Sequence, residues 1–106
     1  MANTYKNAKL DLTTTNATAL YTAASLTTGI VKSIIVSEDS GNADTITITL
    51  TNGSTVYSLF KTKAIGANAT VELLTAPLVI QPTEILKVTA ATANRLHVVA
   101  SVLEIT

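Results

Sequence analysis

Apolar and polar residues alternate strictly along one segment of the chain, from Thr45 to Thr51. Ile46, Ile48 and Leu50 stand at the even positions of this segment, and threonines stand at the odd positions. A period of two is typical of a β-strand that buries one face and exposes the other. Isoleucine and threonine are both β-branched, which further favours a strand over a helix. The segment therefore predicts a half-buried strand whose outer face carries threonine rather than charge.

A hairpin is predicted directly after this strand. Asn52 and Gly53 both accept the positive φ angles of a tight turn, and residues 56–60 form another short apolar run. These two features predict a second strand that folds back on the first. Residues 61–68 are then expected to form a connection, with Gly66 at a turn.

Residues 29–37 predict a strand with two apolar faces. The alternation places one set of side chains on each side of this strand, Ile30, Lys32, Ile34 and Val36 against Val31, Ser33 and Ile35. Because both sets are largely apolar, we expect a central position in a sheet or a contact with another subunit. Further strands are predicted at residues 20–22, 69–74, 78–80, 85–89 and 96–105. A loop is expected at residues 90–94, with a helical turn as the alternative because alanine favours helices.

Together these segments predict an all-β protein. Turn-forming residues separate about eight short strands at intervals of about 8–12 residues, which is typical of an antiparallel β-sandwich or a closed barrel. A length of 106 residues corresponds to one domain. Residues 1–16 are polar apart from a short alternation at Ala8, Leu10 and Leu12. We therefore expect an N-terminal arm with an edge strand over residues 1–16, followed by a single sandwich domain over residues 17–106.

The chain carries few charges. Charged residues make up 13% of it, against about 25% in an ordinary globular domain. Seven basic and seven acidic residues leave no formal net charge. Because such a surface is poorly protected against self-association, we expect much of it to be covered by copies of the protein or by a partner. The alternative is a monomer whose surface is solvated by threonine and serine.

The sequence disfavours several classes of partner. The lysines are scattered, whereas a nucleic-acid surface needs clustered basic residues. No apolar run approaches the roughly 18 residues of a membrane-spanning helix, and the first residues contain no apolar signal segment. Cysteine is absent, which excludes disulfides and thiolate metal sites within these residues. We therefore expect no nucleic-acid partner and no membrane partner.

No catalytic motif accompanies the predicted strands. His97 is the only histidine, and it stands in the last strand without a partner for catalysis or metal binding, which favours a structural role. Glu38, Asp39 and Asp44 belong to a loop that offers oxygen ligands to Ca²⁺, but they lack the spacing of a helix-loop-helix calcium site. An ordinary solvated turn is favoured there. We therefore predict no enzymatic activity, no metal and no cofactor.

The few aromatic residues are expected to have structural roles. Aromatic residues make up only 4% of the chain. Tyr21, Tyr57 and Phe60 offer the elements of a ligand-stacking platform, but so small a number favours filling of the core or anchoring of a subunit contact.

The order of the strand segments carries a family resemblance. A leucine-tyrosine-threonine opening at residues 20–22 leads into the strand at residues 30–37, which begins isoleucine-valine-lysine-serine-isoleucine. The threonine-isoleucine strand follows, and then come the segments at residues 67–73, 77–80 and 84–90, the last of which contains leucine-lysine-valine-threonine-alanine. This order resembles the small virion structural proteins of tailed bacteriophages. The resemblance covers most of residues 17–105.

The resemblance implies a jelly-roll-like sandwich that decorates or cements a phage capsid as a homotrimer. The implied partners are the major capsid protein and copies of the chain itself, and the implied location is the virion surface after synthesis in the bacterial host cytoplasm. Lys6 and Lys9 on the arm are then candidates for contact with an acidic capsid surface. Thr45, Thr47 and Thr49 are candidates for contact with a neighbour, because short hydroxyl side chains bury no charge. The alternatives are a tail, neck or fibre component of the virion and a carbohydrate-binding sandwich module.

Overall fold

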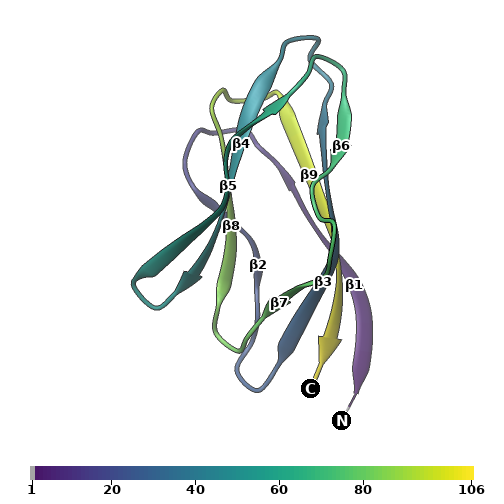
Figure 1. The fold of residues 1–106 in the computed structure, drawn as a ribbon, viewed down its shortest axis with the longest axis vertical. Helices are drawn as coiled ribbons and strands as arrows, with labels where there is room; N and C mark the ends of the chain where they lie inside the picture. The colour runs from purple at the N-terminus through teal and green to yellow at the C-terminus, as the bar shows by residue number, and fades with distance from the viewer. Residues whose placement is uncertain (1) are drawn as a thin grey trace.

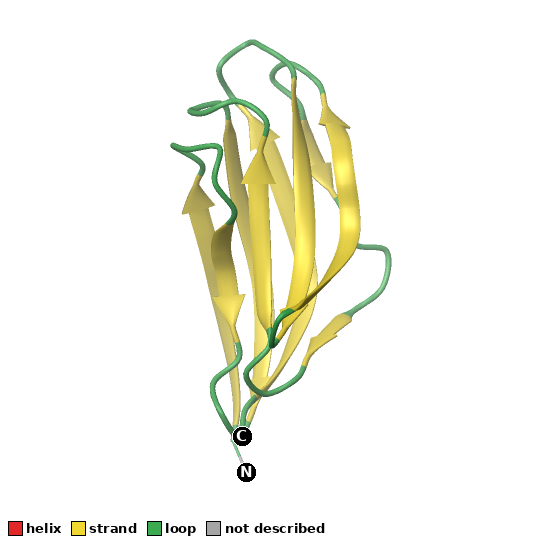
Figure 2. Ribbon diagram, turned by 90° about the vertical axis from the view of Figure 1, so that its left-hand side faces the viewer, coloured by secondary structure: helices red, strands yellow, loops and turns green. Residues whose placement is uncertain are grey.

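A computed structural model of the protein describes residues 2–106, which form nine β-strands and no helix (Figure 1). Figure 2 shows the strands running along the length of the molecule, with the loops gathered at its ends and sides. In chain order the strands are β1 (Asn3–Asp11), β2 (Thr18–Thr22), β3 (Thr28–Glu38), β4 (Asp44–Asn52), β5 (Thr55–Ile65), β6 (Thr70–Glu72), β7 (Leu78–Ile80), β8 (Ile85–Ala90) and β9 (Leu96–Ile105).

The strands form two antiparallel sheets that pack face to face. The five-stranded sheet has the order β1-β9-β3-β6, with β7 also paired to β3, and the four-stranded sheet has the order β2-β8-β4-β5. β7 pairs with the first part of β3 and β6 with its last part, so the two act as one interrupted strand on the same edge. Counted in this way, eight strands follow the double Greek-key order of a jelly roll. The predicted antiparallel, jelly-roll-like sandwich is confirmed.

The core lies between the two sheets and is almost entirely aliphatic. Ile46 and Ile48 of β4 are fully buried, and so are Leu86 and Val88 of the neighbouring β8. Burial of each such side chain stabilises the fold by about 1.5–3 kcal/mol. The threonines that alternate with these isoleucines lie on the opposite, outer face and are half-buried, except for the buried Thr51. The period of two in β4 is therefore confirmed.

The central position predicted for β3 is confirmed, but its predicted alternation of faces is wrong. β3 lies between β9 on one side and β6 and β7 on the other. Its pairing with β9 shifts between Val31 and Ser33, because a β-bulge inserts one extra residue there. The bulge puts Val31 on the same buried side as Ile34 and Val36, whereas Ile30 lies on the outer side.

The strand after the hairpin is longer than predicted. β5 continues to Ile65, where a connection was expected to begin at Lys61. The pairing between β4 and β5 shifts its register twice, once on each side of Ile48. These shifts allow β5 to follow β4 along its whole length. One bulge contains Thr62 at a φ of 49°, and the Thr62 backbone amide donates a hydrogen bond of 3.0 Å to Thr47 Oγ1. A threonine hydroxyl thus replaces the missing ladder partner.

The predicted hairpin is present, but its turn differs in detail. Asn52 pairs with Thr55, so Gly53 and Ser54 are the two central residues. Positive φ occurs at Gly53 (61°) and not at Asn52. Glycine at the first central position is typical of a type II′ turn, in which the second residue needs no positive φ.

The N-terminal segment is an edge strand of the larger sheet. All nine residues of β1 pair with β9, from Asn3 opposite Ile105 to Asp11 opposite His97. Met1, the first residue of the predicted arm, lies outside the described residues. The division into an arm over residues 1–16 and a domain over residues 17–106 stays a prediction.

Candidate subunit interfaces

The outer face of the four-stranded sheet is polar. Thr45, Thr47 and Thr49 of β4 lie on it and are half-buried. Thr47 is directly paired with Thr89, and Thr49 with Lys87, and paired residues of an antiparallel sheet share a face. The hydroxyl of Thr47 already accepts the Thr62 amide. The three predicted contact residues therefore share one face, and their role in contacts stays a prediction.

The outer face of the five-stranded sheet carries a row of four apolar residues. Tyr5 pairs with Leu103, Leu103 with Ile30, and Ile30 with Val79, so the row crosses β1, β9, β3 and β7. Tyr5 is 75% exposed and Val79 is 50% exposed. Because directly paired side chains lie next to one another, these four residues, called the apolar row below, form one continuous strip.

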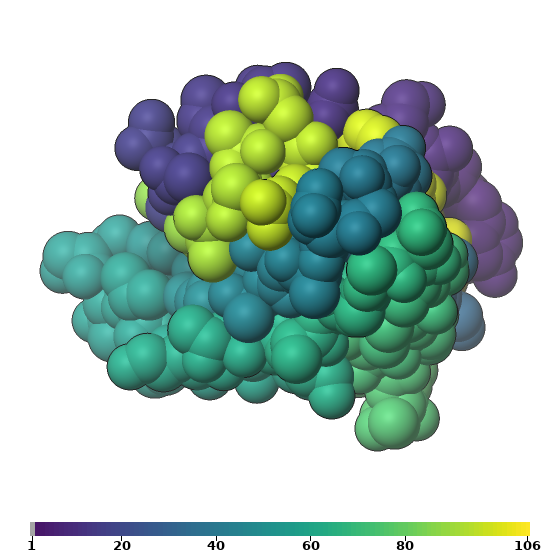
Figure 3. All heavy atoms as spheres, turned by 90° about the horizontal axis from the view of Figure 1, so that it is seen from above, coloured from purple at the N-terminus to yellow at the C-terminus, as the bar shows by residue number. Residues whose placement is uncertain are grey.

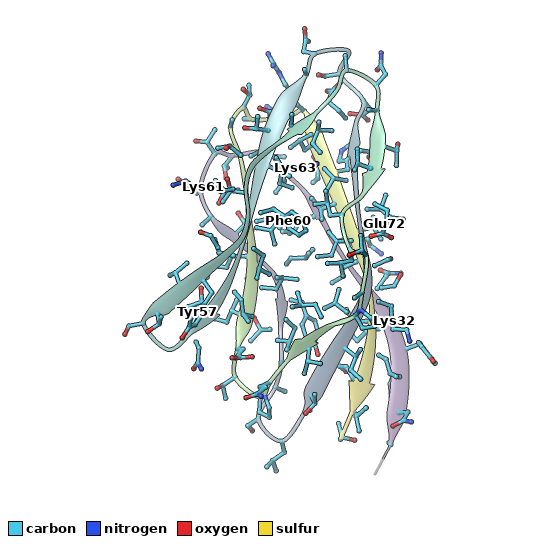
Figure 4. The ribbon with its side chains drawn as sticks, viewed as in Figure 1. Lys32, Tyr57, Phe60, Lys61, Lys63 and Glu72 are labelled. Atoms are coloured by element: carbon cyan, nitrogen blue, oxygen red, sulfur yellow. The ribbon has the colours of Figure 1, made fainter. Side chains whose placement is uncertain are left out.

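A second row on the same face has opposite charges at its two ends. Lys9 pairs with Val99, Val99 with Ile35, and Ile35 with Glu72, so this row crosses β1, β9, β3 and β6. Its two central residues are each 39% exposed. We call it the charged row. Figure 4 shows Glu72 and Lys32 on this outer side of the sheet.

The two lysines predicted as contact residues point to opposite sides of β1. Lys6 pairs with the buried Val102, and its Nζ lies 3.5 Å from Glu104 Oε1. Lys9 is on the outer face, where its Nζ donates to Asn7 Oδ1 at 3.3 Å. The structure therefore brings these lysines neither to each other nor to the threonines of β4. Their role in contacts also stays a prediction.

Each sheet ends in an open strand edge. β1 and β5 each lie at one edge of their sheet, and the opposite edges are formed by β6 with β7 and by β2. β5 is exposed along most of its length and carries Val56, Tyr57 and Leu59 at 58%, 53% and 36% exposure. The β4–β5 hairpin projects from the body of the sandwich at the lower left of Figure 1. Unpaired backbone groups of an edge strand form a template for pairing with another chain.

The three aromatic residues considered as a ligand-stacking platform, Tyr21, Tyr57 and Phe60, have different environments. Tyr21 is buried, and Phe60 points between the sheets and packs against the core (Figure 4). Tyr57 is exposed on the hairpin, so the expected core position is wrong for this residue, although a contact role stays open. Tyr21 Oη donates a hydrogen bond of 2.6 Å to Glu104 Oε2. Burial, together with this hydrogen bond and the charge of Glu104, raises the pKa of Tyr21.

The side chain of Glu38 connects two loops at one end of the sandwich through hydrogen bonds. Its carboxylate accepts hydrogen bonds from the backbone amides of Ser40, Gly41 and Asn68 at 2.8–3.1 Å and from the Ser40 hydroxyl. Figure 3 looks down on this end, where the segment near residue 40 (blue) lies between those near residues 68 (green) and 94 (yellow-green). Burial raises the pKa of Glu38, but the hydrogen bonds outweigh it and lower the pKa to about 2.

Asp44 at the end of this loop also accepts a hydrogen bond from a backbone amide. Asp44 Oδ2 accepts the backbone amide of Thr92 at 3.1 Å. Within residues 2–106, no three His, Asp or Glu side chains are grouped as metal ligands. The ordinary turn favoured by the sequence is consistent with the use of Glu38 and Asp44 as acceptors for backbone amides.

His97 lies between two carboxylates on the surface. Its Nε2 is 3.1 Å from Asp11 Oδ1, and its Nδ1 is 3.4 Å from Asp39 Oδ2. These contacts join β9 to β1 and to the loop after β3, which accords with the structural role predicted for this residue. Lys9 and Leu10 of β1 and Val99 of β9 are among the residues that line the shallow hollow beside His97.

Comparison with known proteins gives a likeness in structure and none in sequence. No protein-family model matches the chain, and no curated protein matches its sequence. Among solved structures it is similar to a protein of the Bacillus endospore appendages, which are described as a novel family of disulfide-linked pili. The match has a TM-score of 0.59 at 12% identity and covers 98% of this chain and 88% of the other. At this identity the likeness establishes the shared fold.

This likeness corrects the resemblance drawn from the sequence. The matched structure is a pilus protein and not a phage capsid protein. The prediction of a capsid decoration protein is therefore wrong, and so are its alternatives elsewhere in the virion. The predicted location on the virion surface and the predicted major-capsid partner are wrong for the same reason. The homotrimer was implied only by that resemblance and loses its support. The physical reason is that the quoted segments are strand patterns, which a jelly-roll core imposes on proteins of different function.

Among residues 2–106, no helix is long and apolar enough to span a bilayer.

Proposed function

We propose that this protein is a non-enzymatic structural subunit that polymerises with copies of itself into a fibre on the outside of a cell or spore. The observation that carries the proposal is the structural likeness to a pilus protein over 98% of the chain. The low charge of 13% and the absence of net charge support it, since they favour association over dispersal.

Disulfides within these residues do not link the copies in such a polymer. The similar appendages are described as disulfide-linked pili, whereas this chain contains no cysteine. Strand pairing at the open edges of β1 and β5 supplies backbone hydrogen bonds between copies. The exposed apolar residues of β5 and of the apolar row supply side-chain contacts.

Electron microscopy and light scattering of the purified protein test this proposal. We expect fibres, or particles many times heavier than the 11.0 kDa chain, as the protein concentration rises. A reducing agent should leave these assemblies intact, because no disulfide is available, whereas urea should dissolve them. A species of 11.0 kDa at every concentration would contradict the proposal.

A further inference from the structure

The two rows on the five-stranded sheet are arranged about a common line. Both rows cross four strand positions, and in both the middle of the row falls between β9 and β3. Consider a twofold axis that runs along this line, parallel to the strands. Rotation about it brings this face of one subunit into contact with the same face of a second subunit. It places Tyr5 opposite Val79 of the partner subunit. It also places Leu103 opposite Ile30 of the partner subunit, so the apolar row meets itself.

The same axis matches the charges of the second row. Lys9 at one end comes to lie opposite Glu72 of the partner subunit, and the reciprocal pair forms at the other end. Between these pairs, Val99 lies opposite Ile35 of the partner subunit. Glu72 Oε2 accepts the amides of Ile34 and Leu74 within its own chain, which leaves Oε1 for a cation. A face that is complementary to itself in this way is the requirement for a twofold contact.

The polar residues between the rows are also compatible with this pairing. Lys32 is exposed at the bulge of β3. Among the described residues, it is the cation that lies between the two rows. The axis brings it to Ser101 and then Asn7 of the partner subunit, whose side chains offer oxygen acceptors. Because Lys32 lies beside the axis, its aliphatic stem covers apolar surface while its ammonium reaches these oxygens, one lysine on each side of the axis.

The size of the face is close to that of a stable contact. Four strands about 4.8 Å apart and about nine residues long cover roughly 600 Å² in projection. Specific interfaces bury about 800 Å² on each partner. The outer face of the other sheet has the same extent, but threonines and Lys87 line most of it, and Thr51 separates its apolar residues Ile85 and Val56, so no continuous apolar row crosses it.

We infer that the outer face of the five-stranded sheet binds the same face of a second copy about a twofold axis between β9 and β3. This inference rests on the proposed function, because it names one of the contacts through which copies associate. It is separate from the strand edges of β1 and β5, which remain open when the two faces meet.

Cysteine crosslinking tests the axis directly, because the chain has no cysteine of its own. Tyr5→Cys and Val79→Cys chains, carrying different affinity tags, are mixed and oxidised, or treated with a short bismaleimide. Both positions are exposed, at 75% and 50%, so the fold tolerates the changes. The mixed 5–79 product should dominate, because two copies of the same position lie about three strand spacings, or roughly 14 Å, apart across the axis.

A matched control variant is Asn42→Cys in the exposed loop between β3 and β4, which belongs neither to the inferred face nor to the edges of β1 and β5. Mixed with Tyr5→Cys, it should give at least about tenfold less crosslinked product. Equal yields of the 5–79 and 5–42 products would overturn the inferred axis. If the wild-type protein nevertheless forms fibres, the proposed function survives that result. If the 5–79 product forms but the wild-type protein assembles no further than a dimer, the inferred twofold contact is supported and the proposed polymerisation into a fibre is wrong.

A pair of charge variants gives a second, independent measurement. Tyr5→Lys alone and Val79→Glu alone should each weaken association by about tenfold, because each puts a charge opposite an apolar side chain. In a 1:1 mixture, Lys at position 5 of one copy faces Glu at position 79 of the other, while the second contact keeps its native residues. Association of the mixture should recover to within about threefold of wild type. Failure of the mixture to recover, with both variants folded by circular dichroism, would contradict the twofold pairing.

Discussion

Replacing Gly29 by alanine should destabilise the protein, because a methyl group at this position has no room beside Tyr21. A Cβ atom placed on Gly29 lies 2.6 Å from Tyr21 Cε2, 2.7 Å from Oη and 2.9 Å from Cζ. Non-bonded carbon atoms prefer separations of about 3.5–4.0 Å. The ring would therefore have to move by about 1 Å, although it is only 6% exposed and its hydroxyl is bonded to Glu104.

The magnitude follows from this overlap and from the backbone. Overpacking of a close-packed core costs about 1–3 kcal/mol. Positive-φ glycines occur at Gly41 and Gly53 and not at Gly29, so alanine meets no backbone strain there. In a compatible backbone, alanine stabilises by about 0.4–1 kcal/mol through the unfolded state. We therefore expect Gly29→Ala to lower the free energy of unfolding by about 1–2 kcal/mol.

A double-mutant cycle isolates the cause. Tyr21→Leu removes the ring, so Gly29→Ala in that background should be neutral or stabilise by up to about 1 kcal/mol. The change of sign corresponds to a coupling energy of about 1–3 kcal/mol between the two positions. Urea denaturation should be followed by far-ultraviolet circular dichroism, since the chain has no tryptophan. Equal destabilisation by Gly29→Ala in both backgrounds would refute the packing argument.

Three further predictions concern the buried polar groups and the core. Thr51→Val should raise the free energy of unfolding by about 1 kcal/mol, because Thr51 Oγ1 is buried without a hydrogen-bond partner; unchanged stability in urea would show that the hydroxyl is satisfied. Ile48→Lys should abolish folding, because Ile48 is fully buried and the ammonium would have no partner; a native circular dichroism spectrum would contradict this. The pKa of Glu38 falls from 4.5 to about 2 on folding, so its contribution to stability is complete above pH 4.5 and is lost as the pH falls towards 2. Glu38→Gln should remove that part of the acid dependence, and identical pH profiles of variant and wild type would argue against it.

The sequence predicted the regular part of the fold well. Residues 45–51 became the central part of β4, and residues 96–105 became β9, because a period of two and β-branched residues act locally. The strand predicted at residues 78–80 became β7. These features depend on the backbone of a few neighbouring residues, and a single sequence contains that information.

The candidate interface was only partly visible in the sequence. The apolar residues on both sides of residues 29–37 indicated a central position in a sheet or a subunit contact, and Ile30 and Ile35 both lie on the outer face. Their partners Tyr5, Val79 and Glu72 come from strands far away in the chain. Only the register of the sheet, including the bulge at Lys32, decides which side chains stand in one row.

The amino-acid sequence alone established that this chain is an all-β protein with few charges and no cysteine. It did so because strand periodicity, turn residues and composition are local properties of the chain. Only the tertiary structure brings the amide of Asn68 to Glu38 and Tyr21 against Gly29, and only it aligns Tyr5, Leu103, Ile30 and Val79 in one apolar row on an outer face. These facts depend on which strands become neighbours and in which register, and long-range pairing across two sheets sets both.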